Sequence, residues 1–260
     1  MYTAPAFFMG AVILFTIAMI LIFFQDRQRI TTAKEQKKKK SQRRAMIDDV
    51  ANSIPSFLCG FTVYDACLLG CMLLNVSTKG SIAAFETLGI SLADSHFAMQ
   101  SSRAGTIVAM SGLFGVFSLL SMGHLVKYFT DVQLIYGGMA VMTVGIVSLS
   151  GFDEVAEGAV ANPTWRYTFA IFLVYAIGYP IGHTAVIGLF SKIVGRRPQG
   201  ALQGWFASAG SLARIIFPIM TGLVSHYFST SCLFFILTAV LVISIIFVFS
   251  ARRTLGLLAS

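Results

Sequence analysis

The stretch SCLFFILTAVLVISIIFVFS, Ser231–Ser250, decides the fold class of this chain, because it runs for 20 residues without a charged side chain. An α-helix rises 1.5 Å per residue, so a run of about 20 residues crosses a hydrocarbon core about 30 Å thick. The stretch therefore predicts a transmembrane helix.

The composition of the whole chain agrees with this prediction. Of 260 residues, 56% are hydrophobic and only 12% are charged, whereas soluble proteins are about 25% charged. We predict an all-α polytopic membrane protein and exclude disorder, a disulfide scaffold and most soluble enzyme folds. Six further apolar runs of spanning length occur, at Pro5–Phe24, Asp65–Ile90, Gly105–Leu125, Val132–Gly151, Tyr167–Phe190 and Ala201–Ser225.

The region Pro55–Asp94 is too long for one span and almost long enough for a hairpin turning at Lys79–Gly80. With one span, the basic residues of the later turns all fall on the side of the basic loop that precedes it. With a hairpin, they would move to the opposite side, and the acids Asp153, Glu154 and Glu157 would move inside. The positive-inside rule therefore favours one span.

The net charge of +8 is concentrated in one loop, where nine of the 19 basic residues lie between Arg27 and Arg44. We expect this loop to be cytoplasmic, with Lys37, Lys38, Lys39 and Lys40 available to anionic lipid headgroups. No aromatic-interleaved basic domain follows, so we exclude nucleic-acid binding.

The predicted layout is one lone transmembrane helix followed by a six-helix half-bundle. Its segments are residues 1–24 for the lone helix, 25–54 for a basic cytoplasmic hinge, 55–250 for the six-helix half and 251–260 for a cytoplasmic tail.

Ionisable residues inside spans are the sharpest functional clue, because each costs about 2.5–3.5 kcal/mol on insertion scales and so faces a partner or water. Asp65, Lys79 and Glu86 are separated by 14 and 7 residues and share one stripe of a helix. We expect this helix to line a water-filled cleft, with Asp65 as a solvated boundary residue close to its cytoplasmic end. The alternative is that Lys79 and Glu86 only neutralise neighbours within the bundle.

Arg214 lies near the middle of another span, and Pro218 four residues later frees its carbonyl and opens a kink. Arg214 is either a structural clamp or a contact for a substrate anion. Glu86 is its expected counter-charge, since we predict no other acid at this depth.

The segment GYPIG contains Gly178, Pro180 and Gly182, which interrupt a span and make it a candidate gate. His183 follows it, either as a hydrogen-bonded core residue, which we favour, or as a proton-coupling group. Glycine pairs also predict close helix contacts. These pairs are Gly112 and Gly115, Gly137 and Gly138, Gly178 and Gly182, and Gly200 and Gly204.

Nothing in the sequence indicates catalysis or a cofactor. Cys67 and Cys71 lie one helical turn apart, but no His or acid completes a metal site at ligand spacing. Zinc-protease, P-loop and nucleophile-elbow signatures are absent from the sequence. We therefore expect no enzyme activity, no metal and no cofactor.

Three stretches resemble one family. FSKIVGRRPQGALQGWFASAGSLARIIFP, Phe190–Pro218, is similar to the tenth and eleventh helices of the major facilitator superfamily, in its endolysosomal branch implicated in neuronal ceroid lipofuscinosis. AFETLG, Ala84–Gly89, and MYTAPAF, Met1–Phe7, resemble that branch's seventh and sixth helices. GHLVKYF, Gly123–Phe129, keeps the glycine and one lysine of the superfamily's cytoplasmic turn motif but lacks its acid.

The resemblance implies a facilitator-type carrier of a small solute in endosomal or lysosomal membranes. It covers the last seven of twelve helices, so we expect a chain truncated at its N-terminus, or an incomplete gene model. A substrate in this fold lies between two halves, and another chain would have to supply the missing half. Lys79, Glu86, His183 and Arg214 are the candidate path residues, with an anionic or zwitterionic solute favoured. The alternatives are an anion-conducting pore and a non-transporting fragment that binds a partner chain.

Overall fold

The computed structural model describes residues 13–18, 63–97, 99–150, 164–195 and 199–259. The chain divides into two compact units, Met1–Pro55 and Ser56–Ser260. In the first unit, residues 13–18 are helical and exposed, inside the predicted span Pro5–Phe24. The rest of that span and the basic stretch with Lys37–Lys40 lie outside the described residues.

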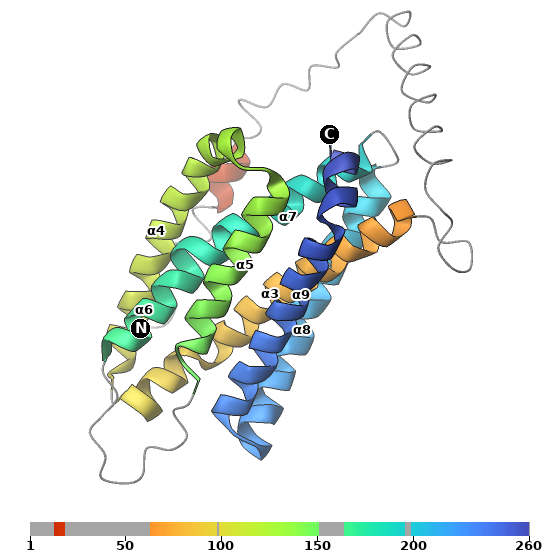
Figure 1. Ribbon diagram of the computed structural model, residues 1–260. Coiled ribbons are helices and arrows are strands. Elements are labelled where there is room, and N and C mark those ends of the chain that lie inside the picture. Colours follow the sequence, from red (N-terminus) through yellow and green to blue (C-terminus); the bar gives the residue numbers. More distant parts are fainter. Residues whose placement is uncertain (1–12, 19–62, 98, 151–163, 196–198, 260) are drawn as a thin grey trace, which may run out of the picture. The chain divides into compact units, whose positions relative to one another are not determined.

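The second unit is a bundle in which long helices run up and down beside one another (Figure 1). Its elements are α3 (Val63–Phe97), α4 (Ser101–Tyr128), α5 (Asp131–Val147), α6 (Thr164–Ile171), the π-helix η1 (Phe172–Gly178), α7 (Tyr179–Val194), α8 (Gln199–Tyr227) and α9 (Thr230–Ala259).

Five helical segments of the described chain are long and apolar enough to cross a membrane. They are Tyr64–Phe97, Ser101–Tyr128, Thr164–Val194, Gly200–Tyr227 and Thr230–Gly256. These segments, without any strand in the described residues, confirm the predicted all-α polytopic membrane protein.

The helix α5 is shorter than its predicted span, Val132–Gly151, and has only 17 residues. It ends at Val147 because the chain turns there: the Ser148 and Ser150 hydroxyls donate to the carbonyls of Gly145 and Val147, at 2.7 Å each. Serine competes with helix continuation in this way. Its start is fixed by a capping box, in which Thr130 and Gln133 bond each other's backbone N–H groups.

The helix α3 runs without a break for 35 residues, so the prediction of one span and no hairpin at Lys79–Gly80 is confirmed. It is the central helix: 72% of its most apolar window is buried, against 11% for α4 and 17% for α8. Residues on α3 are therefore placed to contact several neighbours at once.

Side-chain contacts at the two ends of the bundle fit helices that run alternately in opposite directions. At one end, the Tyr167 hydroxyl donates to the carbonyl of Gly89 at 2.9 Å, and Arg166 Nη2 donates to that of Ser148 at 3.1 Å. At the other end, Lys192 pairs with Asp131. The up-and-down order of these helices is thereby confirmed.

Two clusters of buried side chains form the interior of the bundle. One is centred on Ile82, Phe85, Tyr167 and Phe234, and the other on Cys71, Ile135, Leu189 and Val248. Large apolar side chains on the outer faces of α4, α8 and α9 are exposed, among them Leu120, Ile219 and Ile243. Such faces match an acyl-chain environment.

The predicted glycine contacts are confirmed at two places and wrong at others. A methyl group on Gly138 of α5 would lie 2.5 Å from the Cα and N atoms of Gly182 and 2.9 Å from the Gly178 carbonyl. The helices α5 and α7 therefore pack backbone to backbone. Gly115 similarly admits the Tyr175 carbonyl. Among the described residues, nothing lies within 4 Å of a methyl group placed on Gly112, Gly137, Gly200 or Gly204.

Candidate functional site

The polar face of α3 is where the candidate path begins. Asn75 and Thr78 are fully buried, Lys79 is half-buried and Glu86 is exposed. Asn75 Nδ2 donates to the Phe206 carbonyl of α8 at 2.6 Å. This bond ties α3 to α8 one turn below Lys79.

His183 of α7 faces this part of α3. Its Nδ1 atom lies 3.1 Å from the Thr78 hydroxyl, and its ring stacks on Tyr179 with the ring centres 5.1 Å apart. The imidazole is 8% exposed, so it has a hydrogen-bond partner and a stacking partner within the bundle. This environment is the one we expect of a core histidine.

Lys79 and Arg214 approach each other from α3 and α8, and their charges interact. Gly210 makes this possible, because a methyl group there would lie 2.8 Å from both Lys79 Nζ and Asn75 Nδ2. Gly210 precedes Arg214 by one helical turn, so the lysine crosses α8 beside the arginine. His183 lies within range of both charges.

Glu86 and Arg214 form no ion pair in the part of the chain that the structure describes, and the role of Glu86 as counter-charge stays a prediction. Tyr179 of α7 interacts electrostatically with both Arg214 and Glu86. Tyr175, one turn earlier, interacts electrostatically with Glu86 as well. Sequence reasoning did not select Tyr179, although GYPIG contains it.

The π-helix η1 ends at Gly178, the first residue of the candidate gate. Tyr179 N–H bonds to the Val174 carbonyl, five residues earlier, and Pro180 lies in the first turn of α7. Because Pro180 has no N–H, it cannot bond the Ala176 carbonyl. The Ser118 hydroxyl of α4 donates to that carbonyl at 2.5 Å. Ser118 is thus a residue that the sequence did not reveal, and π-helices often occur at functional sites.

The predicted kink at Pro218 is not accompanied by an end of the helix, since α8 continues through Pro218 to Tyr227. Gly178 and Gly182, by contrast, are locked against Gly138. The two glycines of the candidate gate therefore serve a close helix contact in this structure.

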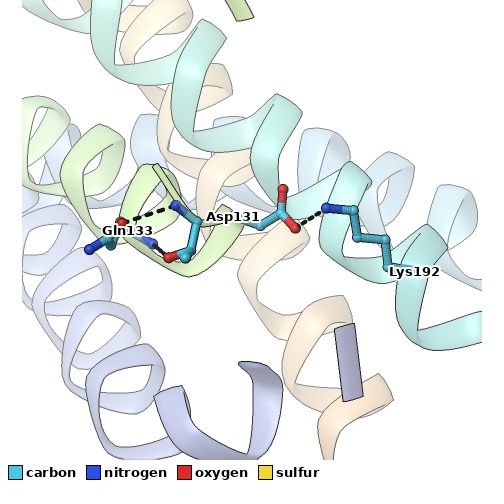
Figure 2. A network of polar contacts seen from close by, with 4 residues as sticks. Asp131, Gln133 and Lys192 are labelled. Carbon is cyan, nitrogen blue, oxygen red and sulfur yellow. Dashed lines mark hydrogen bonds and ion pairs between the residues drawn. The ribbon is translucent and has the colours of Figure 1, made fainter. Parts of the chain in front are cut away.

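The ion pair of Asp131 and Lys192 joins the start of α5 to the last turn of α7, with Oδ2 and Nζ 2.5 Å apart. Figure 2 shows the Asp131 carboxylate pointing at the Lys192 ammonium, beside the capping interactions of Gln133. The motif GHLVKYF lacks an acid, and Asp131 supplies one two residues beyond Phe129.

A cavity of about 340 Å³ lies beside this ion pair, and we name it the end groove. It is lined by residues 126–132 of the α4–α5 turn, Leu189 and Lys192 of α7, and Gly256 of α9. These three segments lie at the same end of the bundle in Figure 1. The four path candidates do not line this groove.

Comparison with known proteins found a similar membrane protein family member. No family model matches the chain. The chain is 27% identical over 292 aligned residues to the major facilitator superfamily domain-containing protein 8 of Xenopus laevis, over 95% of this chain. The similarity supports membership of the major facilitator superfamily. The chain spans about half, 56%, of the length of that relative.

This similarity links the chain to a protein named for the major facilitator superfamily. Together with the apolar helices, it identifies the chain as an integral membrane protein. Lys79, His183 and Arg214 thus lie close together within a half-bundle whose relative is named for this superfamily.

Proposed function

We propose that this chain takes part in facilitator-type transport of a small solute, with Lys79, Glu86, His183 and Arg214 along the polar path. The observation that carries the proposal is that Lys79 of α3 passes against Gly210 of α8, one turn before Arg214, while His183 of α7 interacts with both charges. Solute transport in this fold is a rocking motion of packed bundles around such a path.

The exposure of the charged groups supports a path rather than a lipid-facing surface. Glu86 and Arg214 are exposed near the middle of α3 and α8. A charge at this depth that faced acyl chains would cost about 2.5–3.5 kcal/mol. Their outer side is therefore expected to face water or another polypeptide.

The charge balance of this site favours an anionic or zwitterionic solute. Lys79 and Arg214 lie close enough to repel each other, and no acid pairs with either of them in the described residues. An anion between two such cations would relieve the repulsion and form charge-assisted hydrogen bonds. Glu86 would meet the cationic end of a zwitterion.

The remainder of the path belongs to a second half-bundle in this proposal. The relative is almost twice as long as the aligned chain, and a substrate of this fold lies between two halves. We propose that such a half, supplied by a longer product or a partner chain, covers Glu86 and Arg214. Location in endosomal or lysosomal membranes, and cytoplasmic placement of the hinge and the C-terminus, stay predictions.

The experiment compares Arg214→Ala with Arg253→Ala in a twelve-helix form of the protein reconstituted in liposomes. The readouts are counterflow of a panel of radiolabelled carboxylates and amino acids. We expect Arg214→Ala to reduce flux at least tenfold and Arg253→Ala to leave it within a factor of two. Equal effects would remove the reason for placing Arg214 in the path.

The second candidate function is an anion-conducting pore, which the proximity of Lys79 and Arg214 also favours. Planar-bilayer recordings in potassium chloride distinguish it from a carrier. A pore gives single-channel currents that rise linearly with voltage, whereas a carrier gives saturating exchange and no unitary currents. If the 260-residue chain is inactive in both assays and the longer form is active, the chain alone is a non-transporting fragment.

A further inference from the structure

The end groove combines cationic and aromatic side chains at one end of the membrane-spanning bundle. Lys127 is exposed and forms no ion pair with any described residue, whereas Lys192 is held by Asp131. The charged side chains that line the groove are Lys127, Lys192 and Asp131, so the groove has a net positive charge. On α9, Arg252 and Arg253 lie one turn before Gly256 on the same side of the helix, and both are exposed.

The rim of the end groove is aromatic. Tyr128 and Phe129 end α4 and are 82% and 51% exposed. Aromatic side chains gather at the level of lipid headgroups, where an apolar ring and a polar tip are both accommodated. Their position at the end of a predicted span places the mouth of the groove at that level.

Exposed apolar side chains lie in and below the groove, and we call them its apolar surface. Val126 of α4 lines the groove, and Phe249 of α9 lies two turns before Gly256; both are exposed. Arg252 lies over the Phe249 ring, with its guanidinium carbon 4.4 Å from the ring centre. A ligand with an anionic head and an apolar tail would contact the cations and this surface at the same time.

We propose that the end groove binds the headgroup of an anionic phospholipid. Lys127 and the edge of Lys192 contact the phosphate, Tyr128 and Phe129 flank the glycerol region, and the acyl chains lie along Val126 and Phe249. We favour a lipid over free phosphate as the ligand, because free phosphate has no apolar part that could contact the apolar surface. The proposed site uses other residues than the predicted headgroup contacts Lys37–Lys40, and it is independent of the transport proposal.

Gly256 provides a steric test. A methyl group placed there meets nothing within 4 Å, so the position lines the groove as open space. We expect a leucine side chain at this position to extend into the groove. Gly222 of α8 has equally open surroundings and does not line the groove, which makes Gly222→Leu the matched control.

The experiment measures lipid adducts of the purified 260-residue chain by native mass spectrometry, with phosphatidylglycerol titrated against phosphatidylcholine. The hinge is intact in every variant, so its contribution cancels in the comparison. We expect Gly256→Leu to remove the tightest phosphatidylglycerol adduct and Gly222→Leu to keep it. Lys127→Ala should weaken that adduct about fivefold, since one basic residue near an anionic surface contributes about that much.

Asp131→Asn should change the affinity for phosphatidylglycerol in the opposite direction. It removes the negative charge of the groove and releases Lys192, so the phosphatidylglycerol adduct should tighten. A purely structural role of the ion pair would instead weaken every adduct together with the thermal stability. If Gly256→Leu does not fold, the Lys127→Ala and Asp131→Asn variants decide the outcome.

Two results would overturn the proposal. One is equal loss of the adduct in Gly256→Leu and Gly222→Leu, or no loss in either, because neither pattern requires the groove. The other is full competition by millimolar glycerol phosphate without any effect of acyl chains, which would assign the groove to a soluble phosphate compound.

Discussion

Replacing Gly138 by alanine should separate α5 from α7 and destabilise the bundle. The new methyl group would lie 2.5 Å from the Gly182 Cα atom, whereas non-bonded carbon atoms rest at about 3.5–4.0 Å. The two helices would have to move apart by about 1 Å. The obstacles are backbone atoms, which cannot turn away as a flexible side chain can.

The expected cost is about 3 kcal/mol, the upper end of the range for overpacked interiors. For a bundle of about 200 residues, this lowers the melting temperature by about 6–12 °C. The neighbouring residue is the control. A methyl group on Gly137 meets nothing within 4 Å, so Gly137→Ala should stabilise the helix by about 0.5–1 kcal/mol.

A thiol-reactive dye measures both variants in one detergent. Cys67 and Cys71 are buried free thiols, so they react when the bundle opens and report its melting temperature. Two adjacent glycines should therefore give shifts of opposite sign. If the two alanine variants shift the melting temperature in the same direction by similar amounts, the backbone contact between α5 and α7 does not hold the bundle together.

Two further changes test buried polar contacts and helix capping. Thr78→Val removes the hydroxyl beside His183 Nδ1 and should cost about 1–3 kcal/mol, because it leaves a buried ring nitrogen unpaired; Thr221→Val, at a buried hydroxyl with no partner among the described residues, should be neutral or stabilising in the same melting assay. Thr130→Ala removes the capping box with Gln133 and should cost about 1 kcal/mol, measured as faster amide hydrogen exchange in the first turn of α5. Unchanged exchange there would contradict the assigned cap.

Much of the architecture could be predicted because the membrane imposes simple rules on composition. Backbone polar groups in lipid must be bonded within the segment, so apolar runs of spanning length become helices. The distribution of basic residues favoured one span over a hairpin, and the structure has one helix, α3, over Val63–Phe97. The span of α5 was predicted, but its early end at Val147 was not, because that end depends on the hydroxyl contacts of Ser148 and Ser150 rather than on hydropathy.

Contacts between the side chains of different helices at the candidate site could not be predicted from the sequence. Periodicity could place Lys79 and Glu86 on one stripe of a helix, but it could not say which neighbour would face each of them. We expected Glu86 to be the counter-charge of Arg214, whereas Lys79 passes against Gly210, one turn before Arg214, and Tyr179 interacts with both Arg214 and Glu86. Whether these side chains carry a solute stays a prediction.

The sequence alone predicted a helical membrane protein, the direction of its spans and the polar residues within them. It could do so because the hydropathy and charge of each segment determine whether and in which direction that segment spans a bilayer. Packing decided which glycines touch, that Ser118 satisfies the carbonyl at Pro180, and that α4, α7 and α9 enclose a groove. Those outcomes depend on the rotation and spacing of helices far apart in the chain, which are set by the fit of all the side chains together.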